Sequence, residues 1–409
     1  MRDNRAICGR MTRRGLLMNT GMAALGAALL PRAGRAAVEA PAAPVALARC
    51  RSYDAELMPA LTKMFDQIGG LGRLASGKTV AVKVNLTGDP DSRIGFVPIG
   101  CTAWTHPAVI AGTVHLLGRA GARRIRILES PWRSAEPVQE YISAAGWDPI
   151  LFTGAASNVE FENTNFLGSG KRYVRFPVPR GGHLFPAFDL NHSYADCDVF
   201  VSIGKMKEHL TTGITLSMKN CFGITPCTIY GDGAPDDEAG LVPRGGRFPI
   251  HTGSRQPAKC SPSEIDPKSP REGGYRVPRC VSDLVAARPI HLAIIDGVES
   301  MTGAEGIGPM TKHVAPHVLV AGTNTVCVDA VGMAVMGFDP MADRGKAPFE
   351  FSDSTLRLAE ELGVGTRDLK RIEVIGDRIA DLVFDYRKNG FPMRREIPDH
   401  DHPAAPPKA

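Results

Sequence analysis

Residues 79–84 read TVAVKV and are followed directly by Asn85. The β-branched and apolar residues of this stretch, ended by a polar amide, predict a buried β-strand. A helix is predicted near Thr105, because this hydroxyl is suited to cap a helix and Pro107 falls in the first turn. Residues 124–128 (RIRIL) predict the next strand. A strand, a helix and a strand in this order predict a right-handed crossover between parallel strands.

The same alternation continues along the chain. Further strands are predicted at residues 198–203, 291–295, 317–320 and 371–375. Further helices are predicted at residues 138–145, about 210–222, 326–336 and 354–362. Strands that alternate with helices are typical of α/β proteins. We therefore expect a mostly parallel sheet flanked by helices.

Two regions interrupt this pattern. Residues 225–278 are rich in proline and glycine and lack periodicity, so they are predicted to form a long irregular insertion. The insertion would divide an α/β domain at 46–390 into two lobes of about 46–224 and 279–390. Residues 393–409 form a polar tail that we expect to be disordered. The alternative for the tail is metal binding by its Asp-His-Asp-His string at 399–402.

Residues 1–36 have the organisation of a twin-arginine export signal. Arg13 and Arg14 precede an apolar run at 16–30, and small residues follow. The run is too short to span a bilayer comfortably, so we expect a removable signal and no stable membrane anchor. This predicts export to the periplasm with the twin-arginine (Tat) translocase as a partner. The alternative is a cytosolic protein with a chance arginine pair.

The excess of positive charge lies in the same segment. The whole chain has 48 lysines and arginines against 43 acidic residues, and residues 1–36 hold seven of the basic residues and one of the acidic ones. The rest has 41 basic and 42 acidic residues, which removes the electrostatic support for nucleic-acid binding. The nine cysteines lack ferredoxin spacing, so a ferredoxin-type iron–sulfur cluster is not expected.

Polar residues follow the predicted strands at the points where the strands end. In chain order they are Lys83, Asn85, Glu129, Ser130, Lys205, Asp296 and Glu299. Ligands of open α/β sheets bind beyond the carboxyl ends of the strands. We therefore expect these groups to share one rim, the alternative being a coincidence of ordinary surface residues.

The densest polar stretch is residues 204–220 (GKMKEHLTTGITLSMKN). Lys205, Lys207 and His209 alternate as they would on an extended segment, so they can face one way. Lys219 follows with threonines at helical spacing. This pattern predicts a cationic wall for a carboxylate or phosphate, with His209 as a proton carrier or metal ligand. The alternative is a solvated loop followed by an ordinary amphipathic helix.

Residues 296–310 (DGVESMTGAEGIGPM) are the second candidate region. Their glycines permit close backbone approach to an oxyanion or phosphate. Glu299 and Glu305 are candidate general acids or metal ligands. The stretch matches neither a dinucleotide-binding fingerprint nor a P-loop, and a glycine-rich turn with exposed acids is the alternative.

Several motifs also occur in the order found in a known family. They are VKVN at 82–85, THP at 105–107, KMKEH at 205–209, MKNCFG at 218–223, residues 295–308, and AGTNTVCVDAVGMAVMGFD at 321–339. On these motifs the chain resembles the family catalogued as domain of unknown function 362. The resemblance implies recurrent polar residues at Lys83, Asn85, Lys205, Lys207, Lys219, Asn220, Asp296 and Asp329. Many relatives carry ferredoxin-type cysteine clusters, and this chain departs from them there.

Two functional hypotheses follow. The first is an exported enzyme that acts on a small anionic substrate with a metal or redox cofactor. The predicted substrate-binding residues are Lys83, Asn85, Lys205, Lys207, Lys219 and Asn220. The predicted catalytic residues are His209, Asp296 and Glu299, as acid–base groups or metal ligands. The alternative is a non-catalytic periplasmic protein that binds a ligand or cofactor at the same rim.

Overall fold

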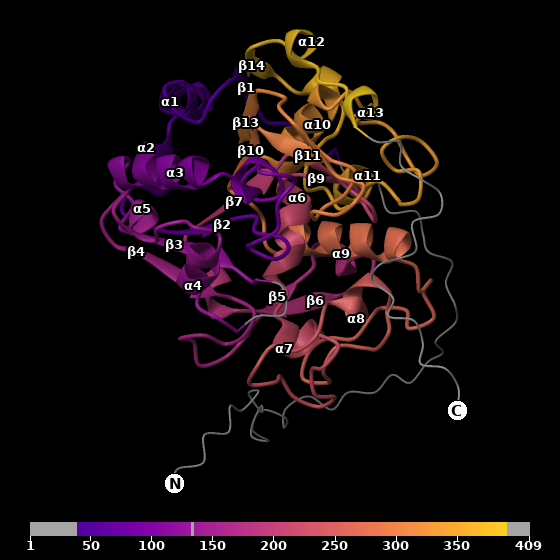
Figure 1. The fold of residues 1–409 in the computed structure, drawn as a ribbon. Coiled ribbons are helices and arrows are strands. Elements are labelled where there is room, and N and C mark those ends of the chain that lie inside the picture. Colours follow the sequence, from indigo (N-terminus) through magenta and orange to yellow (C-terminus); the bar gives the residue numbers. More distant parts are fainter. Residues whose placement is uncertain (1–38, 132–134, 391–409) are drawn as a thin grey trace.

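A computed structural model describes residues 39–131 and 135–390 (Figure 1). Its centre is one eight-stranded sheet. In spatial order the strands are β14 (Val374–Gly376), β1 (Val45–Arg49), β13 (Val318–Gly322), β10 (Leu292–Gly297), β7 (Val199–Lys205), β2 (Thr79–Lys83), β3 (Arg124–Glu129) and β4 (Val159–Asn163). Only β13 runs against its neighbours among these strands. The predicted α/β fold with a mostly parallel sheet is confirmed.

Helices cover both faces of this sheet (Figure 1). One face carries α1 (Leu57–Gln67), α2 (Leu71–Ala75), α3 (Pro107–Arg119), α4 (Val138–Ala144) and α5 (Ile150–Thr153). The other core gathers α6 (Ser217–Asn220), α7 (Cys227–Tyr230), α8 (Phe248–His251), α9 (Gly273–Ala287), α10 (Thr325–Val335), α11 (Thr355–Glu361), α12 (Ile379–Leu382) and α13 (Tyr386–Asn389). Among the described helices, none combines the length and apolarity needed to cross a bilayer.

Two apolar cores arise because successive residues of a strand point to opposite faces. In β7, Phe200 packs in the core that contains α9 and α10, whereas Val199 and Val201 pack with α1 and α3. Each fully buried apolar side chain of this kind contributes roughly 1.5–3 kcal/mol. Burial on both faces explains why the strands read as nearly continuous apolar runs.

Three two-stranded sheets complete the fold. They pair β5 (Val174–Pro177) with β6 (Ala187–Leu190), β8 (Lys207–His209) with β9 (Gly213–Thr215), and β11 (Ser300–Thr302) with β12 (Lys312–Val314). The β8–β9 hairpin follows β7 directly. It therefore carries residues beyond the carboxyl edge of the main sheet.

The helix predicted for residues 210–222 is wrong over its first half, where the chain forms the β8–β9 hairpin. Gly213 has a φ of +76°, and a Cβ there would lie 2.5 Å from the carbonyl oxygen of Pro348. The helix begins only at Ser217, where Asp329 of α10 accepts the N–H groups of Ser217 and Met218, each at 2.9 Å. A distant carboxylate thus starts α6 at a position that local sequence does not mark.

The helix predicted near Thr105 begins at Pro107, but its cap is His106. Nδ1 of His106 accepts the N–H of Ala108 at 3.2 Å. The hydroxyl of Thr105 instead donates to the carbonyl of Ile203 at 3.0 Å, which ties this turn to β7. The predicted cap at Thr105 is therefore wrong by one residue.

The segment 225–278 contains the short helices α7 and α8, and α9 already begins within it at Gly273. A buried ion pair fastens the segment to α9: Glu264 accepts from Arg276 at 2.6 Å, and both side chains are fully buried. α8 packs against α9. These contacts hold residues 247–251 beside the carboxyl edge of the sheet. The predicted export signal and the string at 399–402 lie outside the described residues.

Candidate functional site

The carboxyl ends of β2, β3, β7 and β10 meet at one edge of the sheet, because these strands run parallel. A pocket of about 510 Å³ opens beside this edge. Its walls come from the ends of β2 and β3, the β8–β9 hairpin, α6, the segment that contains α8, and the glycine-rich loop 303–311. Its size is in the range of pockets that bind small organic ligands.

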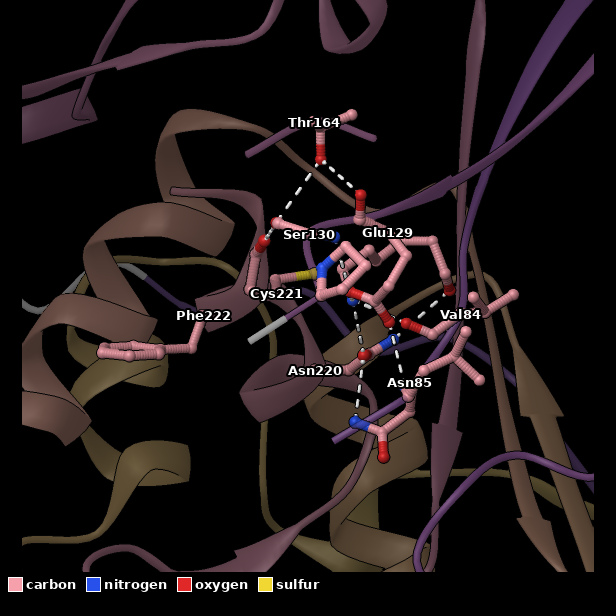
Figure 2. A network of polar contacts seen from close by, with 12 residues as sticks. Val84, Asn85, Glu129, Ser130, Thr164, Asn220, Cys221 and Phe222 are labelled. Carbon is pink, nitrogen blue, oxygen red and sulfur yellow. Dashed lines mark hydrogen bonds and ion pairs between the residues drawn. The ribbon is translucent and has the colours of Figure 1, made fainter. Parts of the chain in front are cut away.

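Asn220 of α6 forms the centre of the pocket floor. Its Nδ2 donates to the carbonyl of Lys83 at 3.3 Å and to the hydroxyl of Ser202 at 3.0 Å. Its Oδ1 accepts from Nζ of Lys83 and Nδ2 of Asn85, each at 3.2 Å. Figure 2 shows Asn220 between Asn85 and the turn that carries Glu129 and Ser130. These bonds fix α6 over the ends of β2 and β7.

Lys83 is a structural part of the same floor. Its ammonium lies 2.6 Å from Glu129 Oε1 and donates to the carbonyl of Val84 at 2.5 Å and to Asn220 at 3.2 Å. An ammonium has three N–H donors, and these three protein partners use them. Glu129 in turn accepts the N–H of Leu86 at 2.9 Å. Lys83 therefore shapes the floor and has no donor left over for an anion.

Lys205 and Asp296 form a second, fully buried pair that does not line the pocket. Nζ of Lys205 donates to Asp296 Oδ2 at 2.8 Å, to the carbonyl of Gly100 at 2.8 Å and to the hydroxyl of Tyr53 at 3.2 Å. Asp296 also accepts from the Tyr53 hydroxyl at 3.0 Å and from the N–H of His106 at 2.9 Å. Protein partners thus surround both charges.

Lys207 and Glu299 also lie outside the pocket lining. Nζ of Lys207 donates to the carbonyls of Ala103 at 2.7 Å and Glu305 at 2.5 Å, which anchors the glycine-rich loop. Burial lowers the pKa of Lys207 to about 7. Glu299 accepts from His313 Nε2 at 2.9 Å, and both side chains are half-buried.

The structure thus divides the predicted site residues into two groups. Those that line the pocket are Lys83, Asn85, His209, Lys219 and Asn220. Those that lie outside its lining are Lys205, Lys207, Asp296 and Glu299. The predicted common rim exists as a sheet edge, but only part of it faces the pocket.

His209 presents a hydrogen-bond donor to the pocket. Its Nδ1 accepts the backbone N–H groups of Thr211 at 3.0 Å and Thr212 at 3.3 Å. Nδ1 therefore has no proton, and the neutral ring carries its proton on Nε2. Burial, assisted by the charge of Lys219, lowers the pKa of His209 well below its ordinary value.

His251 of α8 lines the same pocket in the opposite tautomer. Its Nδ1 lies 2.8 Å from the carbonyl oxygen of Arg247. A carbonyl only accepts, so Nδ1 carries the proton and Nε2 is left with a lone pair. Burial, together with the charge of Lys219, lowers the pKa of His251 to about 3. One wall therefore holds a neutral donor imidazole and the other a neutral acceptor imidazole.

Two cations accompany these histidines. Lys219 is half-buried, with its ammonium 4.5 Å from the centre of the Phe222 ring. Arg247 is 3% exposed, and it donates to the carbonyl of Thr225 at 2.8 Å and to Asn165 Oδ1 at 3.2 Å. These two bonds occupy two of the five N–H donors of a guanidinium.

Sequence reasoning missed Arg247 and His251, because both lie in the segment 225–278 and follow no strand. The available signal was the short run RFPIH at 247–251, where apolar residues lie between an arginine and a histidine. Within residues 39–131 and 135–390, no three histidine, cysteine, aspartate or glutamate side chains are grouped to hold one metal ion.

A family model described as "Domain of unknown function (DUF362)" matches residues 80–334, more than half of the chain. The chain belongs to this family. The DUF362 match runs from β2 through almost all of α10, so it includes the whole pocket floor and both histidines.

Similarity to individual proteins is more limited. A thylakoid-associated protein of Synechocystis sp. is 29% identical over 185 residues, which are 44% of this chain and 50% of that protein. The chain thus spans about half the length of this curated relative. A crystal structure of a protein from Thermotoga maritima has a TM-score of 0.33 at 12% identity, over 64% of this chain and 55% of that chain. The lactate racemase apoprotein from Thermoanaerobacterium thermosaccharolyticum has a TM-score of 0.36 at 13% identity, over 69% and 54%. At these TM-scores neither structure informs the function of this chain.

Proposed function

We propose that this DUF362 protein is an enzyme that moves protons on a small organic anion bound in the pocket. The observation that carries the proposal is the pair of neutral histidines, His209 and His251, in opposite tautomers on two walls of one pocket. A proton shift needs a base that moves the proton and a donor that stabilises the negative charge of the intermediate. Lys219 and Arg247 supply the positive charge that holds an anion.

In this reaction Nε2 of His251 takes a proton from one atom of the substrate and returns it to a second atom, while Nε2–H of His209 donates a hydrogen bond to the oxygen on which negative charge develops. The substrate is isomerised with no net gain or loss of protons. His251 is neutral again once the proton has returned to the substrate, and His209 keeps its Nε2 proton throughout. Lys219 opposes protonation of His251 in the unliganded protein. A bound anion offsets that charge, which raises the pKa of the base toward the working range.

Lys83, Asn220 and Glu129 act as positioning residues that hold α6. The buried pair of Lys205 and Asp296 holds the strand ends together.

The test has two readouts on the full chain. Isothermal titration calorimetry with a panel of small carboxylates and phosphates measures binding, and mass spectrometry in D₂O measures deuterium incorporation into each bound compound. We expect His209→Asn and His251→Asn to retain binding and lose exchange, and Lys219→Met to lose binding. A compound that binds but never exchanges would favour a non-catalytic binding protein instead.

We also propose that the chain is exported through the twin-arginine pathway, supported by the arginine pair and the apolar run that follows it. Replacing Arg13 and Arg14 with lysine should retain the protein in the cytoplasm of a bacterial host, measured by fractionation. A matched pair of substitutions at Arg32 and Arg35 serves as the control. Unchanged periplasmic delivery of the Arg13 and Arg14 variant would contradict the proposal.

A further inference from the structure

Two buried polar atoms of the pocket wall have no hydrogen-bond partner within residues 39–131 and 135–390. They are Oδ1 of Asn85 and Oγ1 of Thr215. The residues are 5% and 3% exposed, and both line the pocket. Buried polar atoms are nearly always paired in folded proteins. Two such atoms on residues that line the same pocket point to a ligand that supplies the missing partners.

The orientation of the Asn85 amide is fixed by its neighbour. Nδ2 of Asn85 donates to Asn220 Oδ1 at 3.2 Å. Asn220 cannot turn over, because its own Nδ2 donates to the Lys83 carbonyl and the Ser202 hydroxyl. If the Asn85 amide were rotated by 180°, its Oδ1 would therefore face Oδ1 of Asn220, and the two oxygens would repel each other. In Figure 2 the Asn85 oxygen points away from Asn220.

An amide oxygen only accepts, so the group opposite Asn85 must be a donor. An ammonium and a hydroxyl both qualify in principle. The ammonium of Lys83 meets the same Asn220 oxygen as Asn85 does, and Lys219 and Arg247 line the same pocket. Like charges repel, so these cations disfavour a second ammonium and favour a neutral donor such as a hydroxyl.

We infer that the anion bound in the pocket carries a hydroxyl group that donates to Oδ1 of Asn85, with the hydroxyl of Thr215 as a further polar contact. This inference rests on the proposed function and narrows its substrate class to hydroxylated organic anions. The anionic group itself is a carboxylate or a phosphate, since lysine and arginine bind both.

The experiment uses two matched pairs of probes on the full chain by isothermal titration calorimetry. Glycerate is compared with propionate, and glycerol 3-phosphate with propyl phosphate, so the arms separate the two anionic groups. In at least one pair we expect the hydroxylated member to bind about tenfold more tightly. In Asn85→Leu the ratio of the two affinities should fall to about one, while the affinity for the member without hydroxyl groups stays within about twofold of the wild-type value.

Two further variants keep the test decisive. Thr215→Val preserves shape and should lower the ratio about threefold even where Asn85→Leu fails to fold. Thr113→Val on α3 removes another buried hydroxyl that has no partner among the described residues and does not line the pocket, so it should leave the ratio unchanged. Equal binding within both pairs overturns the inference and leaves anion binding intact. No binding by any of the four probes overturns the proposed function as well.

Discussion

Two polar clusters lie near the carboxyl edge of the sheet. They contain similar side chains, but one is buried among protein partners and the other lines the pocket. The buried cluster consists of Tyr53, His106, Lys205 and Asp296, and the pocket cluster consists of His209, Lys219, Arg247 and His251. In the buried cluster, protein partners use every donor of the Lys205 ammonium. In the pocket cluster, Arg247 uses two of its five donors, and each histidine turns one ring nitrogen away from its backbone partner.

A charged side chain at a strand end therefore indicates a binding site only when some of its hydrogen-bond donors have no protein partner. A saturated ammonium stabilises the fold through its partners. A cation that has N–H donors without protein partners, as Arg247 has among the described residues, and that lies next to titratable groups in a pocket can bind a ligand. The comparison predicts that the first kind of residue affects folding and the second kind affects binding.

The largest effect is expected from Lys205→Met, which leaves the buried Asp296 without its charged partner. The free energy of unfolding should fall by about 3–5 kcal/mol, measured by urea denaturation. A double variant, Lys205→Met with Asp296→Leu, removes both charges and should recover much of this loss. A single variant as stable as the wild type would show that the buried cluster is not structural.

The next effect is expected at low pH, from His251. Its pKa is lowered to about 3, from an ordinary value of 6.5, so the unfolded chain binds a proton that the folded chain refuses between these values. Stability is therefore lost as the pH falls from 6.5 toward 3, on the order of 4 kcal/mol over the whole window. His251→Asn keeps a donor toward the Arg247 carbonyl and should flatten this acid limb. An unchanged slope of unfolding free energy against pH would contradict the buried neutral ring.

Lys219→Met should weaken anion binding about 10- to 100-fold, because a charged hydrogen bond is lost. Its melting temperature should stay close to that of the wild type, since the half-buried ammonium is not part of the folded core. Calorimetry with the probe anions measures the first quantity and thermal unfolding the second. Lys171→Met, on the exposed surface, is the matched control. Equal losses of binding affinity in both variants would show that Lys219 does not contact the anion.

The smallest effect is a coupling between protons and anions. Lys219 helps lower the pKa of both His209 and His251. An anion that offsets this charge raises both pKa values, so binding is accompanied by proton uptake. Affinity for the probe anions should rise a few-fold as the pH falls from 8 to 5. Calorimetry in buffers of different ionisation enthalpy checks the uptake, and its absence would place the anion away from the histidines.

Much of the fold was predictable, because its strands are buried on both faces and read as apolar runs bounded by polar residues. The predicted strand ends at residues 84, 128 and 203 lie within two residues of the observed ends at Lys83, Glu129 and Lys205. The β8–β9 hairpin was not predictable, because its turn depends on the close approach of Gly213 to Pro348. Neither was the start of α6, which a carboxylate 112 residues away in the chain determines.

The site was predictable only in part, for a related reason. Residue type and position near a strand end indicated Asn85 and His209, and helical spacing with nearby threonines indicated Lys219. All three line the pocket. The same criteria selected Lys205 and Asp296, because a sequence does not show which charges will meet each other. Arg247 and His251 were missed, since long-range packing of the segment 225–278 against α9 brings them to the pocket.

The most direct test of the central claim is the tautomeric state of the two pocket histidines. Long-range ¹H–¹⁵N correlation spectra of ¹⁵N-histidine-labelled protein report it, with His209→Asn and His251→Asn used for assignment. We expect neutral rings at pH 7, protonated at Nε2 in His209 and at Nδ1 in His251. Two rings in the same tautomer, or a charged imidazolium at either position in the unliganded protein, would contradict this expectation.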